Sequence, residues 1–193
     1  MGQATTPPPS RTVDEANQSK QTIETMSVVI ETARLALRDI EQTDLDFTAD
    51  LLGNPQVMRY WPKCYSREEA QQWIAKQRDR YKKDGFGYWL AIEKKTDTPI
   101  GQAGLMKFSI EGKREIGLGY IIHRPFWEKG FATEAASACV QYAFNKLNEP
   151  RVIALIRPEN ETSRNVAQKL LMMPEGLTDY AGYKHLVFAI ERK

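Results

Sequence analysis

The sequence predicts an α+β fold, because strand patterns and helix patterns both recur along one chain. Its clearest strand is an apolar run formed by Ile116, Leu118, Tyr120, Ile121 and Ile122. A helix is expected next, since small or apolar residues recur there at helical spacing: Ala132, Ala135, Ala136, Cys139, Ala143 and Leu147. Two earlier apolar runs, over residues 88–92 and 100–108, predict a hairpin. These patterns indicate a sheet with helices packed against it.

The length of 193 residues is enough for one domain with a sizeable core. The charge is balanced, with 27 basic and 25 acidic residues, which argues against a dedicated nucleic-acid binder. Two cysteines, Cys64 and Cys139, are too few for a disulfide framework and fit a reducing, cytoplasmic compartment. No apolar run approaches membrane-spanning length, so a membrane partner is not expected.

Residues 1–25 are polar, contain the run Pro7-Pro8-Pro9 and show no apolar period. We therefore expect a flexible N-terminal extension over residues 1–27, followed by a folded domain over residues 28–193.

The first half of the domain shows an edge-type strand, two helices and the hairpin in order. Residues 32–38 alternate as a strand, and Thr43 is expected to cap a helix that runs to about Leu52. Ser66 and Glu69 then form a capping box, which opens a second helix with four inward residues. Those residues are Ala70, Trp73, Ile74 and Tyr81.

The second half continues from the central strand and helix. Residues 151–156 read as a buried strand, and residues 158–164 open a helix that is expected to reach about Met172. Residues 175–192 read as two final strands.

A short loop that ends in Gly130 joins the central strand to the central helix. The first turn of a helix leaves backbone N–H groups unbonded, and glycine lets an anion approach the backbone closely. The pattern predicts a phosphate site, although a plain strand-to-helix connection has the same local sequence features.

The loop and helix start, WEKGFATEA from Trp127, resemble the acetyl-CoA pyrophosphate loop of the GNAT acetyltransferase superfamily, most closely in its RimJ/RimL-type branch. The family pattern is Gln/Arg-x-x-Gly-x-Gly/Ala, which Gly130 and Ala132 fit. Trp127 replaces the usual Gln or Arg, and Glu128 replaces a glycine that is usual in the branch. A side chain at that point narrows the phosphate cradle.

The resemblance implies a GNAT fold with a mixed, mostly antiparallel central sheet of roughly six to seven strands, flanked by about four helices. It implies acetyl-CoA as cosubstrate and no metal. Pro158 to Ser163 resembles the family's P-x-N-x-x-S segment beside the pantetheine arm, although these are also ordinary helix-start residues. The implied cofactor-binding residues are Tyr120, Ile121, Ile122, Trp127, Glu128, Lys129, Gly130, Phe131, Ala132, Thr133, Asn160, Ser163 and Arg164.

The acceptor expected from the resemblance is a primary amine, either a protein N-terminus or a small amine, and the protein is expected to be a monomer or homodimer. Arg59, Tyr60 and Trp61 allow two interpretations. Aromatic residues after a short helix usually belong to the core. In the family this region borders the acceptor cleft, so the alternative is a substrate-binding wall.

Direct transfer requires a neutral amine that attacks the thioester carbonyl, which the backbone N–H groups of residues 120–122 would polarise. The branch usually has a carboxylate where Gly117 stands. Glu115, two residues earlier on the same strand face, is the candidate proton relay; an exposed surface charge is the alternative. Many family members protonate the thiolate with a tyrosine where this chain has Ala167, which leaves Ser163 as the candidate.

His123 and His185, the only histidines, have no partner motif and are interpreted as structural. Glycine is usual in the family at Leu171, so the exit of the last helix is expected to differ here. The predicted function is acetyl-CoA-dependent N-acetyl transfer. A non-catalytic acyl-CoA-binding module is the alternative, because the family's usual carboxylate and tyrosine are missing.

Overall fold

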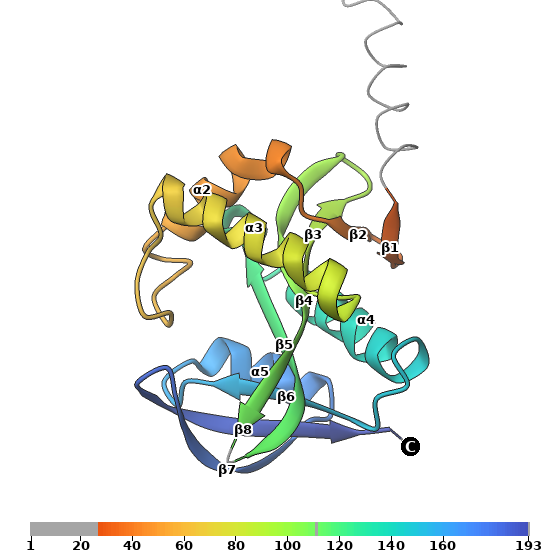
Figure 1. Ribbon diagram of the computed structural model, residues 1–193, viewed down its shortest axis with the longest axis vertical. Coiled ribbons are helices and arrows are strands. Elements are labelled where there is room, and N and C mark those ends of the chain that lie inside the picture. Colours follow the sequence, from red (N-terminus) through yellow and green to blue (C-terminus); the bar gives the residue numbers. More distant parts are fainter. Residues whose placement is uncertain (1–26, 111, 193) are drawn as a thin grey trace, which may run out of the picture.

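The computed structural model of the protein describes residues 27–110 and 112–192 (Figure 1). The predicted flexible extension over residues 1–27 therefore lies outside the described residues, except for its last position. The strands are β1 (Val28–Glu31), β2 (Leu35–Asp39), β3 (Tyr88–Glu93), β4 (Thr98–Ile110), β5 (Lys113–Ile122), β6 (Arg151–Ile156), β7 (Met173–Tyr180) and β8 (Tyr183–Glu191). The α-helices are α2 (Leu45–Gly53), α3 (Arg67–Asp84), α4 (Phe131–Asn145) and α5 (Glu161–Lys169), and two short 3-10 helices are η1 (Gln42–Asp44) and η2 (Arg124–Phe126).

The eight strands form one sheet in the order β1-β2-β3-β4-β5-β6-β8-β7. Every neighbouring pair is antiparallel except β5 and β6, which run parallel. The expected α+β fold with a mixed, mostly antiparallel sheet is confirmed, with one strand more than the six to seven expected. The extra strand is β1, so the segment predicted as an edge strand is instead the second strand of the sheet. β1 has only four residues, too few for a clear alternation.

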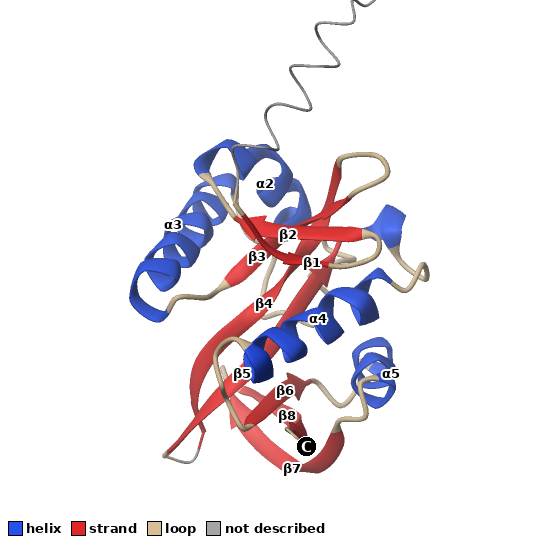
Figure 2. Cartoon of the chain, turned by 90° about the vertical axis from the view of Figure 1, so that its right-hand side faces the viewer, coloured by secondary structure: helices blue, strands red, loops and turns tan. Residues whose placement is uncertain are grey.

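Helices cover both faces of the sheet (Figure 2). α2 and α3 pack on one face, around a core that includes Ile74, Tyr88 and Ile121. α4 and α5 pack on the opposite face, around a core that includes Ile116 and Leu118. Side chains alternate along β5, because successive residues of a strand point to opposite faces. This strand therefore contributes to both cores.

The sheet is divided between β5 and β6. β5 is paired with β4 at ten positions, from Ile110/Lys113 to Gly101/Ile122. With β6, by contrast, it forms a single bridge, between Gly117 and Ile153. Beyond this bridge the two strands have no further ladder in the described part of the chain, and we call the opening toward their carboxyl ends the β5–β6 gap.

Two predicted helix ends differ from the structure. Thr43 does not cap the first helix: Glu41 precedes η1, and the Asp44 carboxylate accepts its backbone N–H at 2.8 Å. The last helix ends at Lys169 and not near Met172, because Leu171 takes a left-handed φ of 61°. The capping box of Ser66 and Glu69 at the start of α3 is confirmed.

The strain at Leu171 can be tested directly. A left-handed residue with a side chain costs about 1–2 kcal/mol, whereas glycine loses about 0.5–1 kcal/mol more chain entropy on folding. Leu171→Gly should therefore raise the free energy of unfolding by up to about 1.5 kcal/mol, the difference between these terms. Urea denaturation measures this. Leu171→Ala, which keeps the Cβ, is the control and should gain nothing; an equal gain in both variants would remove the backbone explanation.

Candidate active site

The backbone of β5 has two different hydrogen-bonding edges. His123 donates its N–H to the Ile100 carbonyl at 2.8 Å, and the register places Ile121 opposite Gln102. Hydrogen-bonded pairs alternate in an antiparallel ladder, so Ile121 bonds to β4, while Tyr120 and Ile122 direct their N–H groups toward β6. Because the ladder with β6 stops at Gly117, these two N–H groups face the β5–β6 gap.

Gly117 and Gly119 lie on the α2/α3 face of β5, where other residues occupy the space of their missing side chains. A Cβ on Gly117 would lie 1.8 Å from the Phe108 ring, and a Cβ on Gly119 would lie 1.8 Å from the Tyr88 hydroxyl. Burial raises the pKa of Tyr88, so its hydroxyl stays protonated at neutral pH. Tyr88 and Phe108 were not predicted as site residues; alternating glycines in a buried strand were the available signal.

Tyr120 connects β5 to the start of α5. Its hydroxyl donates to the Ser163 carbonyl at 3.3 Å, and burial raises its pKa to about 12. Asn160 caps α5, where its side-chain oxygen accepts the Ser163 N–H at 3.1 Å. The structure thus brings three predicted residues together, with Arg164 next to them in sequence. Tyr120 was predicted to act through its backbone N–H group, and the contact of its phenol with α5 was not predicted.

The loop between η2 and α4 presents an open helix start. Gly130 is the N-cap of α4, with φ of 80°, and its carbonyl accepts the Glu134 N–H at 3.1 Å. The N–H groups of Phe131, Ala132 and Thr133 precede this first helical bond, so they have no acceptor within α4. They point out of the helix where an anion is stabilised by the helix dipole.

Trp127 and Glu128, the two residues of this loop that depart from the family pattern, each have a distinct conformation or contact. The Trp127 indole donates its N–H to the Ile122 carbonyl at 2.7 Å, which ties the loop to the end of β5. Glu128 takes a left-handed φ of 62°, a conformation that glycine adopts without strain. Lys129 is exposed, and its ammonium lies 5.2 Å from the centre of the Phe126 ring.

The structure does not bring Glu115 to these groups. Its carboxylate lies 3.3 Å from Nε of Arg151, which also pairs with Glu175 at 2.5 Å and Glu191 at 3.2 Å. Glu115 is five residues before Tyr120 on β5, a separation of about 16 Å along an extended strand.

The predicted acceptor wall is divided between surface and core. Arg59 is exposed, and its guanidinium lies 4.6 Å from the centre of the Tyr60 ring. Trp61 is half-buried and packs edge-to-face on Trp73, with 6.0 Å between the ring centres. The ring centre of Trp73 lies in turn 5.2 Å from that of Tyr88. Only Trp61 is therefore connected to the aromatic residues that lie against β5.

The two histidines lie apart. His123 Nε2 is 3.1 Å from the Asp50 carboxylate, and His185 Nδ1 is 3.0 Å from the Tyr183 carbonyl. Burial lowers the pKa of His185 below its usual value. Over residues 27–110 and 112–192, no group of three or more potential ligands is arranged to hold a metal ion, and no helix is both long and apolar enough to cross a membrane.

The divided sheet and the open helix start beside the opening agree with the fold and cofactor site that the resemblance to acetyltransferases implies. Residues 34–173 match the family described as acetyltransferase (GNAT) domain, so the chain belongs to the GNAT acetyltransferase family.

Among its relatives, the uncharacterized protein YkkB of Bacillus subtilis is 34% identical over 73% of this chain and 83% of its own length. The spermidine N(1)-acetyltransferase of Escherichia coli K12 is 29% identical over 72% of this chain and 73% of its own length. The solved structure of a putative ribosomal-protein-serine acetyltransferase from Vibrio cholerae superposes with a TM-score of 0.71, at 25% identity, over 84% of this chain and 97% of that one. The predicted membership of the GNAT superfamily is thereby confirmed, and the similarity to a ribosomal-protein acetyltransferase structure is consistent with the RimJ/RimL-type branch.

The close contact at Gly119 yields a testable prediction. Gly119→Ala would force its Cβ against the Tyr88 hydroxyl, and such overpacking costs about 1–3 kcal/mol. Adding Tyr88→Phe removes the hydroxyl but keeps the ring carbon Cζ, which would lie 2.6 Å from the same Cβ, so the double variant should recover only part of this loss in a thermal melt. Gly53→Ala, whose Cβ would approach nothing closer than 3.5 Å, is the control. A Gly119→Ala protein as stable as the parent would contradict this account of the contact.

Proposed function

We propose that this GNAT protein transfers an acetyl group from acetyl-CoA to a primary amine by direct attack of the amine on the thioester. The observation that carries the proposal is the open start of α4 beside the β5–β6 gap. The pyrophosphate needs N–H donors and positive potential, which the first turn of α4 supplies. The pantetheine arm has amide groups that can pair with a free strand edge, which β5 supplies through Tyr120 and Ile122.

The residues of the proposed cofactor site have separate roles. The loop from Trp127 to Thr133 would hold the pyrophosphate, with Gly130 and Ala132 leaving room for it. Tyr120 and Ile122 would bind the arm and polarise the thioester carbonyl through their backbone N–H groups, while Ile121 supports the strand from the opposite core. Asn160, Ser163 and Arg164, at the start of α5, would line the other side of the arm.

In the reaction, the amine lone pair forms a bond to the carbonyl carbon, and the carbonyl oxygen becomes an oxyanion held by the backbone donors. The carbon–sulfur bond then breaks, and coenzyme A leaves as the thiolate. The former amine nitrogen releases its extra proton to solvent, which leaves a neutral amide, and the thiolate takes up a proton from solvent. The Ser163 hydroxyl is the proposed hydrogen-bond donor to this sulfur. The Tyr120 phenol is a second candidate, because it reaches Ser163 and its raised pKa keeps it protonated.

The acceptor is proposed to be a protein N-terminus or a small amine. Both kinds are represented among the similar proteins: one relative is named for spermidine, and one structure is named for a ribosomal protein. On this chain, Arg59, Tyr60 and Trp61 are the proposed acceptor wall, and Trp61 is the one in contact with the aromatic residues beside β5.

The loop assignment is tested with Gly130→Glu, which adds bulk and negative charge where the pyrophosphate would sit. Calorimetric titration should show about a 100-fold loss of coenzyme A affinity, which corresponds to about 3 kcal/mol. Gly130→Asn is the matched control, because asparagine tolerates a left-handed φ and carries no charge. A folded Gly130→Glu protein that binds coenzyme A like the parent would remove the assignment. Thiol release with a panel of amines separates an enzyme from a non-catalytic acyl-CoA-binding module.

The role of Glu115 is tested by the pH dependence of turnover in Glu115→Gln. A proton relay would make turnover fall at neutral pH and recover at alkaline pH, where the amine is already neutral. The ion pair with Arg151 and the distance from Tyr120 lead us to expect an unchanged pH–rate profile with a lower melting temperature. Ser163→Ala is the comparison: it should lower turnover at every pH. A loss confined to neutral pH in Glu115→Gln would assign the relay to this carboxylate.

A further inference from the structure

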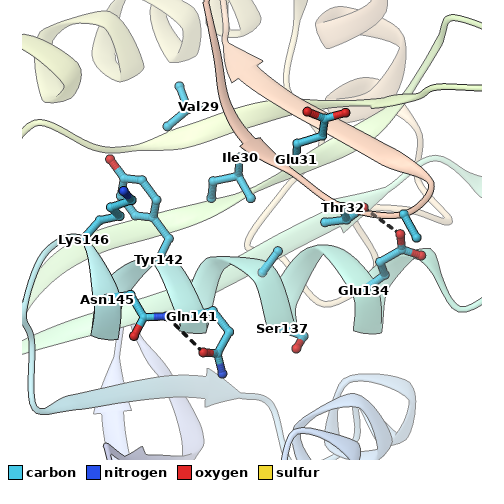
Figure 3. A pocket seen from close by; sticks show the side chains of 12 residues that line it. Val29, Ile30, Glu31, Thr32, Glu134, Ser137, Gln141, Tyr142, Asn145 and Lys146 are labelled. Carbon is cyan, nitrogen blue, oxygen red and sulfur yellow. Dashed lines mark hydrogen bonds between the residues drawn. The ribbon is translucent and has the colours of Figure 1, made fainter.

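The turn between β1 and β2 contacts the first turn of α4, about a hundred residues later in the chain. The Thr32 hydroxyl donates to Oε1 of Glu134 at 2.6 Å, as Figure 3 shows. The backbone N–H of Arg34 donates to the same oxygen at 2.9 Å, and its Nε donates to Oε2 at 2.6 Å. The Glu134 carboxylate therefore receives three hydrogen bonds from this turn.

The Arg34 guanidinium also contacts the proposed phosphate loop itself. Its Nη1 donates to the Lys129 carbonyl at 2.9 Å. Its central carbon lies 4.4 Å from the centre of the Phe131 ring. Its Nη2 lies 3.5 Å from the place that a Cβ on Gly130 would occupy. One side chain thus contacts Lys129 and Phe131 and lies beside Gly130 between them, and about half of it remains exposed to solvent.

Glu134 presents an electrostatic conflict at this place. An acidic residue in the first turn stabilises a helix, but it repels an anion that binds at the same helix end. Burial alone would raise the pKa of Glu134, yet the hydrogen bonds from Thr32 and Arg34 outweigh burial and hold the pKa below its usual range. The carboxylate is therefore ionised at neutral pH, and a cation must compensate it if α4 is to hold a phosphate.

We propose that Arg34 is a positioning residue for the phosphate groups of acetyl-CoA, which holds the Lys129–Phe131 loop in place and compensates the charge of Glu134. This inference rests on the proposed function, because it concerns the same cofactor site. The β1–β2 turn would thereby take part in cofactor binding, which the sequence of the loop before α4 does not indicate.

A merely structural ion pair and a charge-compensating one predict different results for a double variant. If Arg34 only stabilises the fold, removing either partner costs stability, and removing both recovers no affinity for coenzyme A. If Arg34 compensates Glu134, Arg34→Gln leaves an uncompensated carboxylate beside the phosphates. Adding Glu134→Gln then removes this repulsion, and the two changes are non-additive.

The experiment measures the affinity for coenzyme A by calorimetry, and kcat and KM with acetyl-CoA and with acetyl-pantetheine, which lacks the phosphates. Arg34→Gln should weaken coenzyme A binding about 10- to 50-fold, and the double variant should recover most of this loss. Arg34→Lys keeps the charge and should lose less. The KM for acetyl-CoA should rise while kcat and the values for acetyl-pantetheine stay near those of the parent. Arg67→Gln removes an exposed ion pair with Asp46 on α2 and is the matched control, expected to change nothing.

Three results would overturn the inference. In the first, Arg34→Gln binds coenzyme A like the parent. In the second, the double variant binds as weakly as Arg34→Gln. In the third, acetyl-pantetheine turnover falls as much as acetyl-CoA turnover, which would indicate a general loss of structure. A parent protein that binds no coenzyme A would overturn the proposed function, and this inference with it.

Discussion

The single bridge between Gly117 and Ile153 is the constraint on which the rest of the site depends. Two strands that diverge after one bridge leave backbone N–H groups without ladder partners, and such groups cost about 1–3 kcal/mol each when buried and unpaired. The arrangement persists because each half of the sheet is anchored elsewhere: β5 by ten pairs with β4, and β6 by six pairs with β8. A ligand with its own amide groups can supply the missing partners, which is why the β5–β6 gap is the proposed binding edge for the pantetheine arm.

Trp127 and Glu128, which depart from the family pattern, lie in the loop beside that gap, and the contacts of the loop explain how they are accommodated. Trp127 uses its indole N–H to bond the Ile122 carbonyl, so it closes the outer end of the free strand edge and fixes the loop at one point. Arg34 fixes the same loop at a second point, through the Lys129 carbonyl. With one anchor on β5 and one on the β1–β2 turn, the left-handed backbone at Glu128 and Gly130 can be held without a glycine-rich loop.

Local features were predictable from sequence, and contacts across the fold were not. The capping box at Ser66, the glycine-tipped loop before α4 and the strand over residues 151–156 each carry their signal within a few residues. The pairing of Arg34 with Glu134 joins segments about a hundred residues apart, and neither segment alone indicates the other. Glu115 combines both cases. Strand alternation predicts that it shares a face of β5 with Gly117, but only the fold shows that Arg151 from β6 lies beside it.

The proposed acceptor wall and the proposed cofactor site lie against the same strand, β5. On the α2/α3 face, Trp61, Trp73 and Tyr88 form a continuous aromatic contact that ends with the Tyr88 hydroxyl against Gly119. The next residue, Tyr120, directs its backbone N–H group toward the β5–β6 gap, and its phenol points toward α5 on the opposite face. A glycine is required at position 119 because any side chain there would displace the hydroxyl. One peptide unit therefore joins Gly119, which contacts the aromatic residues packed on α3, to Tyr120, whose N–H group is proposed to polarise the thioester. We expect a change in the packing of Tyr88 to shift this N–H group.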